Sequence, residues 1–204
     1  MDSGAKTDVG QLIGAARAGG DALGRLLERY RAYLTLLARV QIGRRLQGKA
    51  DPAELVQETF LEAHRSYDRF RGDTEATLLA WLRKILANRT AKLVRRFGGT
   101  QARDLGLEVA LELEVDASSV RLDPGLIDRG ESPSGAAAGR EVAVVLAEAL
   151  ERLPPDYREV IILRQLEEQP FTEVAGRMGR SVDAVQKLWV RGLALLRREI
   201  EGGR

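Results

Sequence analysis

The chain has 204 residues, 44% of them hydrophobic and 30% charged, which fits one globular domain or two small ones and excludes a wholly fibrous or disordered protein. It contains no cysteine and a single histidine, His64, which excludes disulfides, thiolate zinc sites and sites built from several histidines. No apolar run is long enough for a transmembrane helix and no secretory signal is visible, so we expect a cytoplasmic protein without membrane insertion.

The net charge of +2 is unevenly distributed along the chain. Residues 1–97 carry 18 Lys and Arg against 11 Asp and Glu, residues 98–140 carry 4 against 8, and residues 141–204 carry 10 against 11. Within these, residues 80–97 hold six basic residues and no acid, and residues 177–198 hold six against one acid. Two separate basic stretches predict two contacts with a polyanion.

The first two predicted helices lie in the first third of the chain. Residues 21–47 repeat leucines three and four apart, which indicates an amphipathic helix. A second helix begins at Asp51 as N-cap, with Pro52 and Glu54 completing a capping-box arrangement, and ends near Tyr67–Phe70. The side chains that this second helix should direct toward a core are Leu55, Phe60 and Leu61.

A third helix follows the turn at residues 71–73. Thr74 can cap it, and Gly98 and Gly99 should end it. Residues 1–97 are therefore expected to form one compact helical domain.

Residues 98–140 lack a sustained helical period and are acidic, with several glycines and prolines. They are expected to form a flexible linker, although residues 105–115 alternate loosely and allow a short strand or helix. Helical periodicity resumes from residue 141, so residues 141–204 are expected to form a second small helical domain. The predicted fold is all-α, with two helical domains joined by an acidic linker.

The last part of the chain contains the most specific local pattern. In the segment that starts at Phe171, a small residue stands at position five (Ala175), a glycine at position nine (Gly179) and a branched residue at position fifteen (Val185). This spacing is typical of a helix-turn-helix, in which the two helices cross closely and the glycine makes the turn. Ser181 can cap the second helix. A plain helical hairpin with a solvated basic face is the alternative.

The outward side chains of the second helix would face a major groove, where Gln can read adenine and Arg or Lys can contact guanine or phosphate. The candidate DNA-binding residues of this helix are Arg180, Ser181, Asp183, Ala184, Gln186, Lys187 and Arg191.

The basic helix that follows Thr74 is a second candidate nucleic-acid surface. Arginines beside aromatic rings suit single-stranded or opened DNA, where bases stack and phosphates pair with Arg. We expect residues 67–71 to form an exposed loop, whereas Trp81 lies near the apolar face, which favours a core role over a DNA contact. The candidates are Tyr67, Phe70, Arg71, Trp81, Arg83, Lys84, Asn88, Arg89, Lys92, Arg95 and Arg96.

These two blocks resemble a known family. Residues 51–97, with LVQETF, then FRG, then a WL-x-x-I-x-x-N pattern, resemble the second conserved region of bacterial sigma factors, in particular the extracytoplasmic-function (ECF) branch of the sigma-70 family. Residues 149–199 resemble the fourth region of the same proteins. The sequence departs from the usual pattern at Ala53–Leu55, where many members have two acids, at Gly192, where alanine is usual, and in its long linker.

The resemblance implies a division of labour between the two regions. Asp51, Glu54, Gln57 and Glu58 would dock on the RNA polymerase core enzyme, the loop and helix after residue 67 would capture and melt the −10 element, and the helix-turn-helix would read the −35 element of promoter DNA. The helices at 141–168 would make a second polymerase contact, and the linker would run through the RNA path of the enzyme. An anti-sigma factor is a further candidate partner.

The sequence therefore predicts a transcription initiation factor rather than an enzyme, with no cofactor and no metal site. His64 has no serine or acid partner in the pattern of a catalytic triad and is interpreted as a surface or interface residue. A helix-turn-helix regulator with an N-terminal sensing or dimerisation domain is the alternative. A nucleic-acid-processing enzyme is disfavoured because the sequence has no acidic metal cluster or phosphate-binding glycine loop.

Overall fold

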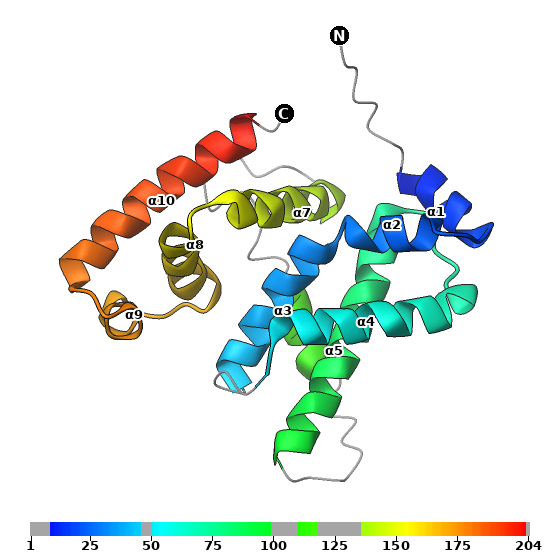
Figure 1. Ribbon diagram of the computed structural model, residues 1–204, viewed down its shortest axis with the longest axis horizontal. Coiled ribbons are helices and arrows are strands. Elements are labelled where there is room, and N and C mark those ends of the chain that lie inside the picture. The colour runs from blue at the N-terminus through cyan, green and yellow to red at the C-terminus, as the bar shows by residue number, and fades with distance from the viewer. Residues whose placement is uncertain (1–8, 46–49, 99–109, 118–135, 203–204) are drawn as a thin grey trace.

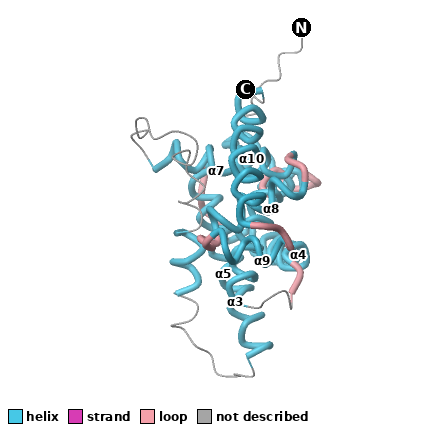
Figure 2. The backbone as a smooth tube through the Cα atoms, turned by 90° about the vertical axis from the view of Figure 1, so that its left-hand side faces the viewer, coloured by secondary structure: helices cyan, strands magenta, loops and turns pink. Residues whose placement is uncertain are grey.

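The structure is a computed structural model that describes residues 9–45, 50–98, 110–117 and 136–202. These residues form helices and loops with no strand among them (Figure 2). The predicted all-α fold is confirmed. No helix in the described ranges is both long and apolar enough to cross a membrane.

Within the described ranges up to residue 98, the N-terminal bundle is built from α1 (Val9–Arg17), α2 (Ala22–Glu28), α3 (Arg31–Arg45), α4 (Pro52–Ser66) and α5 (Glu75–Gly98). Helices α3, α4 and α5 pack against one another, and α1 packs against α2. Each contributes its apolar stripe to the core, as the three- and four-residue spacing of leucines requires.

The predicted start signals of α4 and α5 are confirmed. The Asp51 carboxylate accepts a hydrogen bond from the Ala53 N–H at 2.8 Å, and the Thr74 hydroxyl accepts one from the Thr77 N–H at 3.3 Å. The expected single helix over 21–47 is instead interrupted by a turn at residues 29 and 30. Tyr30 is fully buried there, and its hydroxyl donates to Glu75 at 2.9 Å.

The C-terminal bundle consists of α7 (Ala136–Arg152), α8 (Pro155–Ile161), α9 (Phe171–Met178) and α10 (Val182–Gly202). A π-helical turn, Ile162–Leu166, follows α8 directly. Helix α10 packs against α7, α8 and α9, so it holds the bundle together. Helix α7 begins at residue 136, five residues before the predicted start of the second domain.

Part of the expected linker is ordered helix. Residues 110–117 are helical, and Leu111 and Val115 within them are fully buried. The alternative of a short helix within residues 105–115 is therefore confirmed for residues 110–115. A flexible linker does not describe residues 110–117, because their two buried apolar side chains contribute to the core. Residues 99–109 and 118–135 of the predicted linker lie outside the described part of the chain.

The two bundles touch through α3, which lies in the middle of the molecule between α7 and α4 (Figure 1). Arg39 of α3 forms an ion pair with Glu159 of α8. A Cβ on Gly43 would lie 3.1 Å from Oε1 of Glu167, whose side chain is only 3% exposed, so the two bundles approach closely at this point. The predicted division into two domains stays a prediction, since the buried side chains of both bundles form one continuous cluster.

Candidate nucleic-acid interface

The turn between α9 and α10 has the geometry that the sequence pattern predicts. Gly179 ends α9 in the left-handed region with φ 62°, a conformation that costs glycine little because it has no side chain. The Arg180 N–H donates to the Ala175 carbonyl at 3.0 Å, which satisfies an open carbonyl at the helix end. Ser181 caps α10 by accepting a hydrogen bond from the Ala184 N–H at 3.2 Å.

The inner face of this helix pair is packed as expected. Val174 and Val185 are fully buried between the helices, and Met178 and Leu188 are half-buried beside them. Gly192 lies where α10 crosses α8, and a Cβ at that position would meet the Ile161 side chain at 3.2 Å. The close crossing of α10 and α8 therefore accounts for the glycine at position 192. With the turn at Gly179, the cap at Ser181 and the buried inner face, α9 and α10 form a helix-turn-helix.

The side chains predicted to contact DNA lie on the outer surface of α10 and at its start. Arg180, Ser181, Asp183, Gln186, Lys187 and Arg191 are exposed, and Ala184 is half-buried. Arg180 pairs with Asp156 of α8, and the Lys187 Nζ lies 2.8 Å from a carboxylate oxygen of Asp183. All four partners are exposed, so these ion pairs contribute little to stability and can exchange for phosphates.

The expectation of an exposed loop at residues 67–71 is wrong for its two aromatic residues. Tyr67 and Phe70 are buried, 5% and 6% exposed, and pack with Trp81 in an aromatic cluster whose ring centroids lie 4.9 to 6.0 Å apart. The Tyr67 hydroxyl donates to the Ile13 carbonyl of α1 at 3.1 Å. In this arrangement neither Tyr67 nor Phe70 presents a free ring face to a base.

The sequence contains a signal for this burial. The 3₁₀ turn Tyr67–Arg69 continues α4 directly, so Tyr67 falls four residues after the buried Ala63, in register with the core stripe. A Cβ on Gly72 would lie 2.5 Å from the Phe70 ring, so glycine is needed for the chain to pass this close. Burial raises the pKa of Tyr67, an effect that the nearby Arg17 charge opposes. Arg71 is exposed, as predicted.

Helix α5 presents only part of its predicted basic surface. Lys84, Lys92 and Arg96 are exposed, whereas Trp81, Asn88, Arg89 and Arg95 are half-buried. Arg83, a candidate DNA-binding residue, is instead buried: its side chain is 10% exposed, with Nε 2.5 Å from the Asp116 carboxylate. Arg83 is also 3.4 Å from the Tyr33 hydroxyl. Burial disfavours its charged form, but Tyr33 and Asp116 outweigh burial and raise the pKa of Arg83.

The outer face of α4 carries the residues predicted to bind polymerase. Asp51, Glu54, Gln57 and Glu58 are all exposed. Leu61, expected in the core, is instead 48% exposed, because it follows Gln57 by four residues and shares its outward face. The α4 surface, defined as these five residues, is thus acidic with one apolar side chain. His64 is exposed, as expected of a surface residue.

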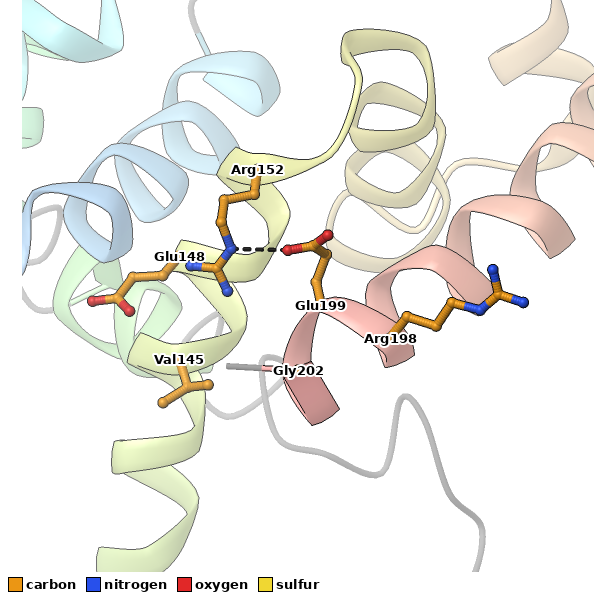
Figure 3. A pocket seen from close by; sticks show the side chains of 6 residues that line it. All are labelled: Val145, Glu148, Arg152, Arg198, Glu199 and Gly202. Carbon is orange, nitrogen blue, oxygen red and sulfur yellow. Dashed lines mark hydrogen bonds and ion pairs between the residues drawn. The ribbon is translucent and has the colours of Figure 1, made fainter. Parts of the chain in front are cut away.

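A groove of about 390 Å³ lies between α7 and the end of α10 (Figure 3). Arg152 and Glu199 point toward one another across it, 3.0 Å apart, and tie the two helices together. Its lining is mainly polar, and it lies at the opposite end of α10 from the start of that helix, where the predicted DNA-binding residues lie. Among the described residues, no group of three or more His, Cys, Asp and Glu could hold a metal ion.

Comparison with known proteins agrees with this geometry. The family model of sigma-70 region 2 matches residues 29–98, and that of sigma-70 region 4 matches residues 143–196. The ECF RNA polymerase sigma-E factor of Salmonella typhimurium is 30% identical over 136 residues, which span 67% of this chain and 66% of that protein. The ECF RNA polymerase sigma factor SigG of Mycobacterium tuberculosis is 33% identical over 155 residues, 72% of this chain and 41% of the relative.

Among solved structures, that of CnrH in complex with the cytosolic domain of CnrY is 25% identical in sequence. It covers 97% of this chain and 100% of the matched chain, with a TM-score of 0.36. The two sigma-70 regions occur here in order and on the two bundles that the structure describes. The chain belongs to the sigma-70 family, and its curated relatives are ECF sigma factors.

Proposed function

We propose that this protein is a promoter-specificity factor that binds the RNA polymerase core enzyme in the cytoplasm and directs it to promoters. The polymerase performs the chemistry, and this chain supplies recognition of the −35 and −10 elements. The observation that carries the proposal is the pairing, in one chain, of an exposed helix-turn-helix surface with a separate basic helix beside an acidic α4 surface.

The α4 surface is the proposed polymerase contact. Its exposed carboxylates and amide suit a basic partner helix, and the exposed Leu61 adds an apolar contact one helical turn beyond Gln57. The proposed −10 surface comprises Arg71 and those predicted residues of α5 that are exposed or half-buried, namely Trp81, Lys84, Asn88, Arg89, Lys92, Arg95 and Arg96. The proposed −35 surface is the outer face of α10.

Binding to core polymerase tests the proposal directly. The double variant Glu54→Lys and Glu58→Lys is expected to bind core polymerase about tenfold more weakly, or worse, because like charges would face the partner. Glu201→Lys, also exposed but at the end of α10, changes charge without touching the α4 surface and should bind like the wild type. The measurement is co-purification and titration with core enzyme, followed by run-off transcription on a promoter library.

Wild-type protein that binds promoter DNA but not polymerase would contradict the proposal, because a helix-turn-helix regulator would behave in that way. Equal polymerase binding by the α4 variant and the wild type would place the polymerase contact on another surface.

Recognition of the −35 element gives a second prediction. Gln186→Ala should weaken binding to a duplex −35 element by about 1–3 kcal/mol and relax specificity at one base, since an amide pairs with a base edge. Lys187→Ala should weaken binding to all sequences and reduce the salt slope by about one, as the loss of a phosphate contact does. Fluorescence anisotropy at several salt concentrations measures both effects. An equal loss of polymerase affinity in both variants would show that this face of α10 does not bind DNA.

A further inference from the structure

The helical segment 110–117 lies against α5 and is held by two kinds of contact. Leu111 and Val115, one helical turn apart, are fully buried, whereas Leu113 between them is 66% exposed. The segment therefore has one buried face and one solvent face, as an amphipathic helix packed on a surface does.

The edge of the buried face carries carboxylates that pair with α5. Asp116 lies 2.5 Å from Nε of Arg83, and Glu112 lies 3.6 Å from Nζ of Lys84. Glu112 and Asp116 are also one turn apart, so both reach the same stretch of α5. The segment contains three acids and no basic residue, and α5 contains six basic residues and no acid between 80 and 97.

We propose that segment 110–117 is an intramolecular competitor for nucleic acid, which covers α5 around Arg83 and Lys84 until single-stranded DNA displaces it. The inference deepens the proposed function, because it rests on α5 being the surface for opened DNA. In the covered state Arg83 is buried and Lys84 is paired, so the two side chains that begin the basic stretch are occupied by the protein's own carboxylates.

DNA can compete for the charged contacts from their exposed side. In the Glu112–Lys84 pair the side chains are 39% and 61% exposed, so water and salt screen this pair. In the Asp116–Arg83 pair Asp116 is 51% exposed, whereas Arg83 beneath it is 10% exposed. A single strand offers one phosphate per nucleotide together with bases that stack, whereas the segment offers two carboxylates to α5. The apparent dissociation constant for DNA is the intrinsic one divided by the fraction of uncovered protein, so a segment bound nine-tenths of the time weakens binding about tenfold.

Four full-length proteins test the inference by binding to a fluorescein-labelled strand of about twenty thymidines, a length that spans at least one typical binding site. They are the wild type, the apolar variant Leu111→Ala with Val115→Ala, the charge variant Glu112→Gln with Asp116→Asn, and the control Leu113→Ala. The apolar and charge variants are expected to bind about five- to tenfold more tightly than the wild type. The control changes the same residue type on the solvent face of the same helix and should bind like the wild type.

The apolar variant leaves the net charge of the protein unchanged. Tighter DNA binding by this variant therefore reports displacement of segment 110–117 and not a change in the electrostatic attraction between protein and DNA. Tighter binding by the charge variant alone would overturn the inference. Equal binding by all four proteins would also overturn it. In both cases α5 would remain a DNA-binding surface. If none of the four proteins binds the strand, the α5 surface proposed for opened DNA is wrong and the inference falls with it.

Amide hydrogen exchange tests the inference on the wild-type protein, in which no substitution can alter the fold. Saturation with the thymidine strand should speed amide exchange in residues 110–117, because the segment leaves its packed position. Unchanged or slower exchange there would overturn the inference.

Discussion

Phe70→Ala is expected to lower the free energy of unfolding by about 3–5 kcal/mol. The ring is 6% exposed and packs against Tyr67 and Trp81, with centroids 5.8 and 4.9 Å away, so its removal leaves a cavity in the N-terminal bundle. The neighbouring Arg71→Ala should change stability by less than about 0.5 kcal/mol, because Arg71 is exposed. Urea denaturation followed by circular dichroism measures both. A Phe70→Ala variant as stable as the wild type would contradict the packing described for this cluster.

This expected result changes how the proposed melting role is tested. A loss of transcription in Phe70→Ala would reflect unfolding as much as lost DNA contact, whereas Arg71→Ala isolates the DNA contact. If Arg71 helps to open the −10 element, its replacement should impair run-off transcription on closed duplex promoters more than on templates with a melted −10 bubble, with permanganate footprints reduced in parallel. Equal yields on both templates would place melting elsewhere.

Val185→Asp is expected to destabilise the C-terminal bundle by about 4 kcal/mol or more. Val185 is fully buried between α9 and α10, and a carboxylate at that position would lose its water without gaining a partner. Val190→Asp provides a matched control on the same helix, because Val190 is 59% exposed, and it should change stability by less than about 0.5 kcal/mol. Thermal unfolding followed by circular dichroism compares them.

The functional consequence of Val185→Asp should be the loss of duplex −35 binding, with the α4 surface intact. Retention of full −35 affinity in Val185→Asp would show that the pair of helices does not depend on this contact and that the helix-turn-helix assignment of α9 and α10 is wrong.

The parts of the fold that sequence could predict are those set by local constraints. Asp51 and Thr74 cap their helices, and Gly179 turns the chain, because each of these roles depends on a few neighbouring residues. The spacing of Ala175 and Val185 is likewise internal to one helix pair. The candidate −35 residues therefore lie on the outer surface of α10, as expected.

The parts that sequence could not predict depend on partners far along the chain. Tyr67 is buried because α1 covers it, through a hydrogen bond to Ile13, and Arg83 is buried because Asp116 returns to meet it. The turn at residues 29 and 30 interrupts a good helical pattern, and the hydroxyl of Tyr30 at this turn donates to Glu75 of α5. Tertiary contacts of this kind override local helix propensity. The four-residue register from Ala63 indicates that Tyr67 is buried, but it does not identify α1 as the element that covers it.

The contact between α3 and the C-terminal bundle limits how far apart two DNA elements can lie if one protein molecule is to touch both. A compact chain of 204 residues has a radius of gyration of about 17 Å and so spans roughly 45 Å. Positions −10 and −35 lie about 25 base pairs apart, which is about 85 Å of straight B-form duplex. A protein closed through Arg39 and Glu159 is therefore too short to touch both positions at once.

For a factor that reads both elements, the two bundles must separate before or during promoter binding. The free energy of separating α3 from α7 and α8 then adds to the cost of binding DNA, and the apparent promoter affinity of the free protein falls by the same factor. A core enzyme that holds the bundles apart removes that cost in advance, so promoter search by the factor alone would be suppressed and search by the assembled enzyme would not.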